Sequence, residues 1–138
     1  MEALNFEISS DINSISSAVS GVMQYLDGSC VNIDECAIFD IRVILNELLI
    51  NSIIHGNKKN LDKKIMIRVG VSGKGYFFVF VEDEGKGYDF KRFLNRETPH
   101  QSLSEMKEYG RGVLIIESLC DRIKFNKKGN KVIVLKKI

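Results

Sequence analysis

The amino-acid sequence predicts a single α/β domain, in which helices and β-strands alternate along a chain of 138 residues. A chain of this length can bury most of its apolar surface in one core. Hydrophobic residues make up 44% of the sequence and charged residues 28%, which is typical of a globular protein. The apolar residues recur at helical spacing in some segments and alternate with polar residues in others, so both helices and strands are expected.

A short strand and a helix are expected first. Residues 3–8 alternate weakly between apolar and polar side chains, as in a strand. Apolar residues at helical spacing then predict a helix from Asp11 to Leu26, and Gly28 follows its end.

A longer helix is predicted from Asn32 to Ile54. Asn32 with Glu35 three positions later resembles a capping box, which marks a helix start. Gly56 follows the helix and is expected to close it in a left-handed conformation, which costs glycine no steric strain.

Four strands and one further helix are expected in the second half of the chain. The strands cover residues 64–71, 76–81, 122–125 and 131–137, and the helix covers residues 112–119. Glycine-containing turns separate the strands within each pair, as in β-hairpins.

The strand over residues 76–81 is apolar on both faces. A sheet with helices on one side only should instead expose polar residues at alternate positions of such a strand. We therefore expect its second face to be covered by a homodimer partner or another bound protein, or else by the terminal segments of the same chain.

Residues 88–109 are polar and irregular, and they contain the only proline, Pro99. A loop of this length in a small domain is more often functional than a simple connection. We expect it to form a lid that closes over bound phosphates and excludes water.

The net charge of +2 conceals two oppositely charged halves. Residues 1–57 hold eight acids and one base, a balance of −7, whereas residues 58–138 hold ten acids and 19 bases, a balance of +9. The lysines of the second half are spread along strands without interleaved aromatic residues, which argues against nucleic-acid binding. A basic half does suit a polyanionic ligand such as ATP.

The sequence also disfavours two other classes of protein, membrane-spanning proteins and zinc proteins. The longest apolar stretch, around residues 43–54, is interrupted by Glu47 and Asn51, so no membrane span is expected. The three cysteines and two histidines lack the spacing of zinc ligands. Unpaired thiols and the absence of a basic signal-peptide start predict a cytoplasmic protein.

Glu47 and Asn51 lie four residues apart, and a helix places them on one face. Near a bound polyanion, the carboxylate could accept a proton from a hydroxyl group, as a general base does. The amide oxygen could bind Mg²⁺, which often takes one or two protein ligands besides water and phosphate oxygens. Taken alone, each could equally be a polar residue on a helix surface.

Asp83 follows the apolar strand, and its carboxylate could accept a hydrogen bond from an exocyclic amine such as that of adenine. Gly85 and Gly87 would let the backbone pass close to a flat base. Taken alone, this motif is also a common turn at a strand end.

Gly110-Arg111-Gly112 precedes the apolar helix expected over residues 112–119. A helix N-terminus with free amide groups binds anions, and arginine adds a bidentate donor. In this order and spacing, the three motifs predict a site for Mg-ATP and phosphoryl transfer.

Together these motifs resemble those of the GHKL (Bergerat-fold) ATPases. The pair Glu47 and Asn51 is similar to the N box of that superfamily. The run from Asp83 to Gly87 is similar to its first glycine box, and Gly110-Arg111-Gly112 to its second. Within the superfamily the chain looks most like the RsbW-type serine-protein kinases that double as anti-sigma factors. The stretches that favour this branch are residues 51–56, 87–89, 110–116 and 119–121.

The resemblance implies a two-layer α/β sandwich with a mixed, mainly antiparallel Bergerat-type sheet, helices on one face and an ATP lid, all in one domain over residues 1–138. It implies ATP and Mg²⁺ as cofactors, with Asn51 as the metal ligand, Asp83 on adenine and Glu47 as the catalytic base. The implied partners are a STAS-domain anti-anti-sigma protein, phosphorylated on serine or threonine, a sigma factor, and a second copy of the chain.

The sequence departs from the family near its last strand. Members commonly carry a glycine followed by threonines there, whose hydroxyl supports the adenine pocket. This chain has Gly129 followed by Asn130, Lys131 and Val132, with no hydroxyl group. The amide of Asn130 could supply a comparable hydrogen bond.

Two other functions stay open. One is the detached catalytic domain of a histidine kinase, which is disfavoured because no histidine precedes His55. The other is a binding module that sequesters a partner without transferring phosphate, since a shared fold does not separate the two activities. Glu47 favours catalysis, because a protein that only binds has no need of a base there.

Overall fold

The computed structural model of the protein describes residues 2–29, 32–87 and 108–138, and of residues 108–110 the backbone alone. The elements in chain order are β1 (Leu4–Ser9), α1 (Ser14–Asp27), α2 (Glu35–Ile50), η1 (Asn51–Gly56), β2 (Lys64–Val71), β3 (Tyr76–Glu82), α4 (Glu108–Leu119), β4 (Arg122–Phe125) and β5 (Lys131–Lys137). Residues 88–107 of the predicted lid lie outside the described residues, and residues 108 and 109 belong to α4.

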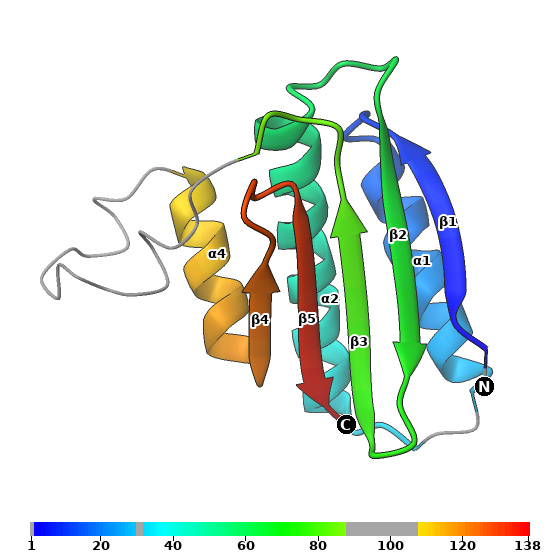
Figure 1. Cartoon of the computed structure of the whole chain (residues 1–138). Coiled ribbons are helices and arrows are strands. Elements are labelled where there is room, and N and C mark those ends of the chain that lie inside the picture. The colour runs from blue at the N-terminus through cyan, green and yellow to red at the C-terminus, as the bar shows by residue number, and fades with distance from the viewer. Residues whose placement is uncertain (1, 30–31, 88–107) are drawn as a thin grey trace, which may run out of the picture.

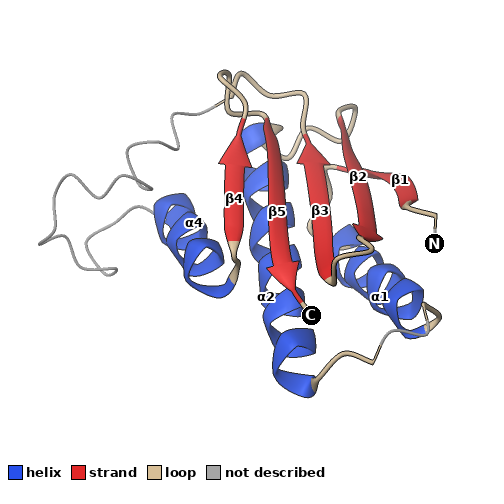
Figure 2. Ribbon diagram, turned by 60° about the horizontal axis from the view of Figure 1, so that its bottom comes forward, coloured by secondary structure: helices blue, strands red, loops and turns tan. Residues whose placement is uncertain are grey.

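The five strands form one sheet in the order β1-β2-β3-β5-β4, and every neighbouring pair is antiparallel. Figures 1 and 2 show helices α1, α2 and α4 on one face of this sheet. The two-layer α/β sandwich is therefore confirmed, but the sheet is antiparallel throughout and not mixed. In the part of the chain that the structure describes, no helix is long and apolar enough to cross a membrane.

The core lies between the sheet and the three helices. Side chains on β2 and β3 alternate between the two faces of the sheet, which sends Ile67 and Val79 inward with no more than 1% of their surface exposed. From the helix layer, Ile41, Ile53 and Ile116 meet them and are fully buried. Helix α2 lies behind β3 and β5, and α4 lies next to α2 at the β4 edge of the sheet (Figure 1).

The opposite face of the sheet carries apolar side chains at its centre. Phe78 and Phe80 are half-buried there, and Met66 and Ile133 on the neighbouring strands are 46% and 39% exposed. Both terminal segments are strands of the sheet itself, so the expectation that they cover this face is wrong (Figure 1).

Both predicted ends of the long helix need correction. The cap is Asp34 and not Asn32, because Asp34 is extended and its Oδ1 accepts a 2.9 Å hydrogen bond from the N–H of Ala37. Gly56 is not left-handed, because the chain continues through it as the π-helix η1. The positive φ angles come later, at Lys58 (53°) and Lys59 (60°).

Candidate nucleotide-binding site

The first motif sits where α2 becomes a π-helix. Glu47 lies in the last turn of α2, and Asn51 is the first residue of η1. The N–H of Asn51 donates to the carbonyl of Glu47, so the two side chains leave the same helix face one turn apart. Short π-helical segments are frequent at functional sites.

Helix α4 packs against this face through a glycine. A Cβ atom at Gly112 would lie 2.7 Å from Oε2 of Glu47 and 3.4 Å from Oδ1 of Asn51. A contact of 2.7 Å is closer than real Cβ atoms show, so with any other residue at this position the Glu47 carboxylate would have to move aside. The structure thus brings the first motif and part of the third motif together.

The second glycine box lies inside α4. The prediction that this helix begins at Gly112 was wrong, because its first residue is Glu108. Glycine weakens a helix, but here its missing side chain leaves room for the Glu47 carboxylate beside α4. Gly110 and Arg111 therefore lie in the first turn, where backbone N–H groups have no acceptor within the helix. The Arg111 side chain is exposed.

Asp83 is buried directly after β3, with 8% of its surface exposed. Its Oδ1 accepts a 2.8 Å hydrogen bond from the backbone N–H of Gly85. Burial raises the pKa of Asp83 above its ordinary value, while the bond from Gly85 and the charge of Lys128 oppose this shift. Because Gly85 engages Oδ1, Oδ2 is the oxygen that a ligand could use.

Three glycines bring the loop after β3 into place. A Cβ atom at Gly56 would lie 2.5 Å from Cγ of Asp83, and one at Gly85 would overlap the carbonyl of Gly56. Gly87 has a φ angle of +85°, and its Cβ would overlap the carbonyl of Lys128. We expected Gly85 and Gly87 to leave room for a flat base. In the structure the Cβ positions of both glycines meet backbone carbonyls, and Gly87 also lines the cavity, so their role beside a base stays a prediction.

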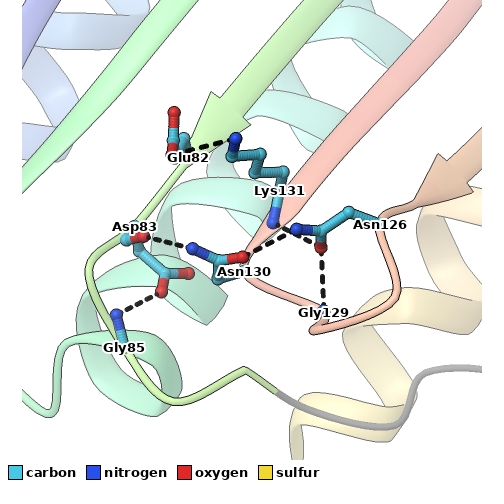
Figure 3. A network of polar contacts seen from close by, with 7 residues as sticks. All are labelled: Glu82, Asp83, Gly85, Asn126, Gly129, Asn130 and Lys131. Atoms are coloured by element: carbon cyan, nitrogen blue, oxygen red, sulfur yellow. Dashed lines mark hydrogen bonds and ion pairs between the residues drawn. The ribbon is translucent and has the colours of Figure 1, made fainter.

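Asn130 supports Asp83 from the other side, as Figure 3 shows. The side-chain Nδ2 of Asn130 donates to the backbone carbonyl of Asp83 at 3.0 Å. The backbone carbonyl of Asn130 accepts from the backbone N–H of Asp83 at 3.0 Å. Asn126 orients Asn130 by donating to its Oδ1 at 2.8 Å. Oδ1 of Asn126 in turn accepts from the N–H groups of Gly129 and Lys131. Asn130 thus holds the loop that carries Asp83, and its support of an adenine pocket stays a prediction.

These side chains surround a cavity of about 30 Å³. Its lining residues are Leu48, Asn51, Ser52, His55, Gly56, Asp83, Gly87, Phe125, Gly129, Asn130, Lys131 and Val132. A space of this size holds roughly one water molecule. A purine ring therefore enters only if the walls move apart.

The chemistry of the lining fits an adenine nucleotide. The Asp83 carboxylate is an acceptor for an amine, and the Asn51 amide carries a hard oxygen suited to Mg²⁺. Over residues 2–29, 32–87 and 108–138, no group of three or more histidine, cysteine, aspartate or glutamate side chains could hold a metal ion. A magnesium ion at Asn51 would draw on phosphate oxygens and water as further ligands, as Mg²⁺ commonly does.

Two buried polar residues beneath the site were missed by the sequence analysis. Ser10 and Asn57 are each 1% exposed and hydrogen bond to one another. Neither belongs to a motif. The one available signal was a polar residue just after a predicted helix end, and such residues are usually exposed.

The chain belongs to the histidine kinase-like ATPase domain family, whose model matches residues 8–136. It is 26% identical over 105 residues to serine-protein kinase RsbW of Oceanobacillus iheyensis, a match that covers 73% of this chain and 65% of the relative. It is 29% identical over 89 residues to the anti-sigma F factor of Priestia megaterium, covering 62% of this chain and 57% of that protein. The chain thus spans less than two thirds of these relatives.

A solved structure has the same fold. The crystal structure of the RsbU and RsbW domains of a Mycobacterium tuberculosis protein matches 99% of this chain and 32% of its own, with a TM-score of 0.67 and 17% identity. This match establishes the fold independently of the motifs.

Proposed function

We propose that this protein is an ATP-dependent serine/threonine-protein kinase of a partner-switching module. The observation that carries the proposal is the convergence of Glu47, Asn51 and Gly112 next to a cavity walled by the buried Asp83. Similarity to proteins named serine-protein kinase RsbW and anti-sigma F factor supports it.

Each motif has one role in this proposal. Asp83 accepts a hydrogen bond from the adenine amine, and Asn51 binds the Mg²⁺ that neutralises the phosphates. Glu47 takes the proton of the attacking hydroxyl while the new O–P bond forms and ADP leaves. The N–H groups of Gly110 and Arg111, at the start of α4, donate to phosphate oxygens.

The protein partners follow from the same proposal. The phosphate acceptor is a serine or threonine of a STAS-domain anti-anti-sigma protein, and the sequestered partner is a sigma factor. We place this exchange in the cytoplasm. A homodimer accounts for the half-buried Phe78 and Phe80, because apolar patches on a sheet face usually mark an interface.

A second candidate is a sequestering protein that transfers no phosphate. The observation in its favour is the small cavity, about 30 Å³, which must widen before it can admit adenine.

Two measurements on the native protein separate these functions. Titration calorimetry with Mg-ATP and Mg-GTP tests the nucleotide site, and we expect binding of ATP in preference to GTP. Transfer of radiolabelled phosphate from ATP to STAS proteins encoded nearby tests the kinase. No heat with millimolar Mg-ATP would refute the nucleotide site, whereas binding without transfer would favour the sequestering protein.

A further inference from the structure

Asn57 lies directly after η1, and its side chain joins three separate segments. Oδ1 accepts a hydrogen bond from the backbone N–H of Glu84 at 2.8 Å. Nδ2 donates to Oγ of Ser10 at 2.8 Å and to the carbonyl of Lys64 at 3.0 Å. Both N–H donors of the amide are thus in use.

The partners of Asn57 are also bound to one another. Ser10 donates from Oγ to the carbonyl of Lys63 at 2.7 Å. Oε2 of Glu84 accepts a 2.6 Å hydrogen bond from the N–H of Lys64. Asn57 therefore closes a network between the β1–α1 connection, the start of β2 and the loop after β3.

This network reaches the candidate site through the residues next to Glu84 and Asn57 in the chain. Glu84 directly follows Asp83, and the Asp83 carboxylate packs against Gly56, which directly precedes Asn57. On its other side, Asp83 is held by Asn130. Asn57 thus ties the Asp83 loop to the end of the helix that carries Asn51, although Asn57 does not line the cavity.

We propose that Asn57 is a positioning residue of the nucleotide site. It holds Asp83 at a set distance from Asn51, so that one nucleotide can place its base at Asp83 and its phosphates at Asn51. This inference rests on the proposed function, because it requires Asp83 to face adenine. If the bond to Glu84 is lost, affinity for ATP and preference over GTP both fall, while turnover at saturating ATP is preserved because Glu47 is untouched.

Three variants test this role. Asn57→Ala removes all three hydrogen bonds of the side chain. Asn57→Asp keeps an acceptor for the Glu84 N–H but loses both donors that anchor the side chain. Ser10→Ala is the matched control, because it removes the two hydrogen bonds of the Ser10 hydroxyl, with Asn57 and with Lys63, and leaves the bond from the Glu84 N–H to Asn57 in place.

Calorimetry on folded samples should show Mg-ATP binding about tenfold weaker in Asn57→Ala, the usual scale for one lost hydrogen bond. Ser10→Ala should stay within about twofold of the native protein, and Asn57→Asp should fall between the two. In phosphate-transfer assays, the KM for ATP should rise in Asn57→Ala with little change in kcat. Hydrogen exchange without nucleotide should accelerate over residues 83–87 in Asn57→Ala and not in Ser10→Ala.

Native affinity in Asn57→Ala, or an equal loss in Ser10→Ala, would overturn the inference and leave Asn57 a purely structural residue. If Asn57→Ala does not fold, Asn57→Asp binding no more weakly than Ser10→Ala overturns it. A native protein that binds no Mg-ATP refutes the proposed function and the nucleotide role of Asn57 together. If the native protein binds Mg-ATP and the Asn57 variants bind it with the same affinity, only the role of Asn57 is refuted.

Discussion

Replacing Gly56 by alanine should move Asp83 without removing any polar group. The new Cβ atom would lie 2.5 Å from Cγ of Asp83 and 2.8 Å from its Oδ1. Ordinary contacts of a Cβ atom begin at about 3.4 Å. Oδ2 lies closer still, so the carboxylate must retreat by roughly 1 Å, since the backbone of Gly56 is fixed within η1.

A shift of this size is enough to break a hydrogen bond to adenine. A bond of about 2.9 Å would lengthen beyond about 3.5 Å, outside hydrogen-bonding range. Hydrogen bonds to a charged group contribute about 1.5–3 kcal/mol, so Mg-ATP should bind about 10- to 100-fold more weakly. Binding of GTP should change less, and the preference for ATP should shrink.

Calorimetry with both nucleotides, at a temperature where circular dichroism shows each variant folded, measures this effect. Gly21→Ala on α1 is the matched control, because nothing lies within 4 Å of its new Cβ atom. That variant should bind like the native protein and be slightly more stable, as alanine is in a helix. Native affinity and native preference in Gly56→Ala would show that Asp83 does not read the base.

Three further predictions concern the base, the buried acid and the outer face of the sheet. Glu47→Gln should bind Mg-ATP normally but phosphorylate its partner at least ~10²-fold more slowly. Transfer at the native rate would show that Glu47 is a charged surface residue and not the base. Burial raises the pKa of Asp83 above 3.8, so its ionised form costs stability at neutral pH. Asp83→Asn should therefore resist urea better than the native protein at about pH 7, with the difference shrinking as the pH falls towards 4, and an equal midpoint at neutral pH would contradict this. Phe80→Arg should convert a dimer to a monomer by light scattering, whereas Phe39→Arg, on the helix side and 65% exposed, should not. A native monomer at tens of micromolar would refute the dimer.

The local parts of the site could be predicted from the sequence. Glu47 and Asn51 share a helix face because their spacing is a property of the helix itself, and the structure keeps it even though η1 is a π-helix. The five strands were placed within a residue or two by alternation and turn residues. The cap of α2 was misplaced because Asp34, and not Asn32, accepts the hydrogen bond from Ala37. The start of α4 was misplaced because glycines lie inside that helix, where Gly112 faces Glu47.

The sequence by itself determined the class of fold and the motifs that resemble the GHKL ATPases, because these depend on periodicity and spacing along the chain. Only the tertiary structure decided what the glycines of the motifs pack against. Gly56 meets Asp83 and Gly112 meets Glu47 across long sequence separations. The tertiary structure also decided that the Asn57 side chain is buried and makes three hydrogen bonds. Burial of a polar side chain depends on partners that folding brings from distant segments.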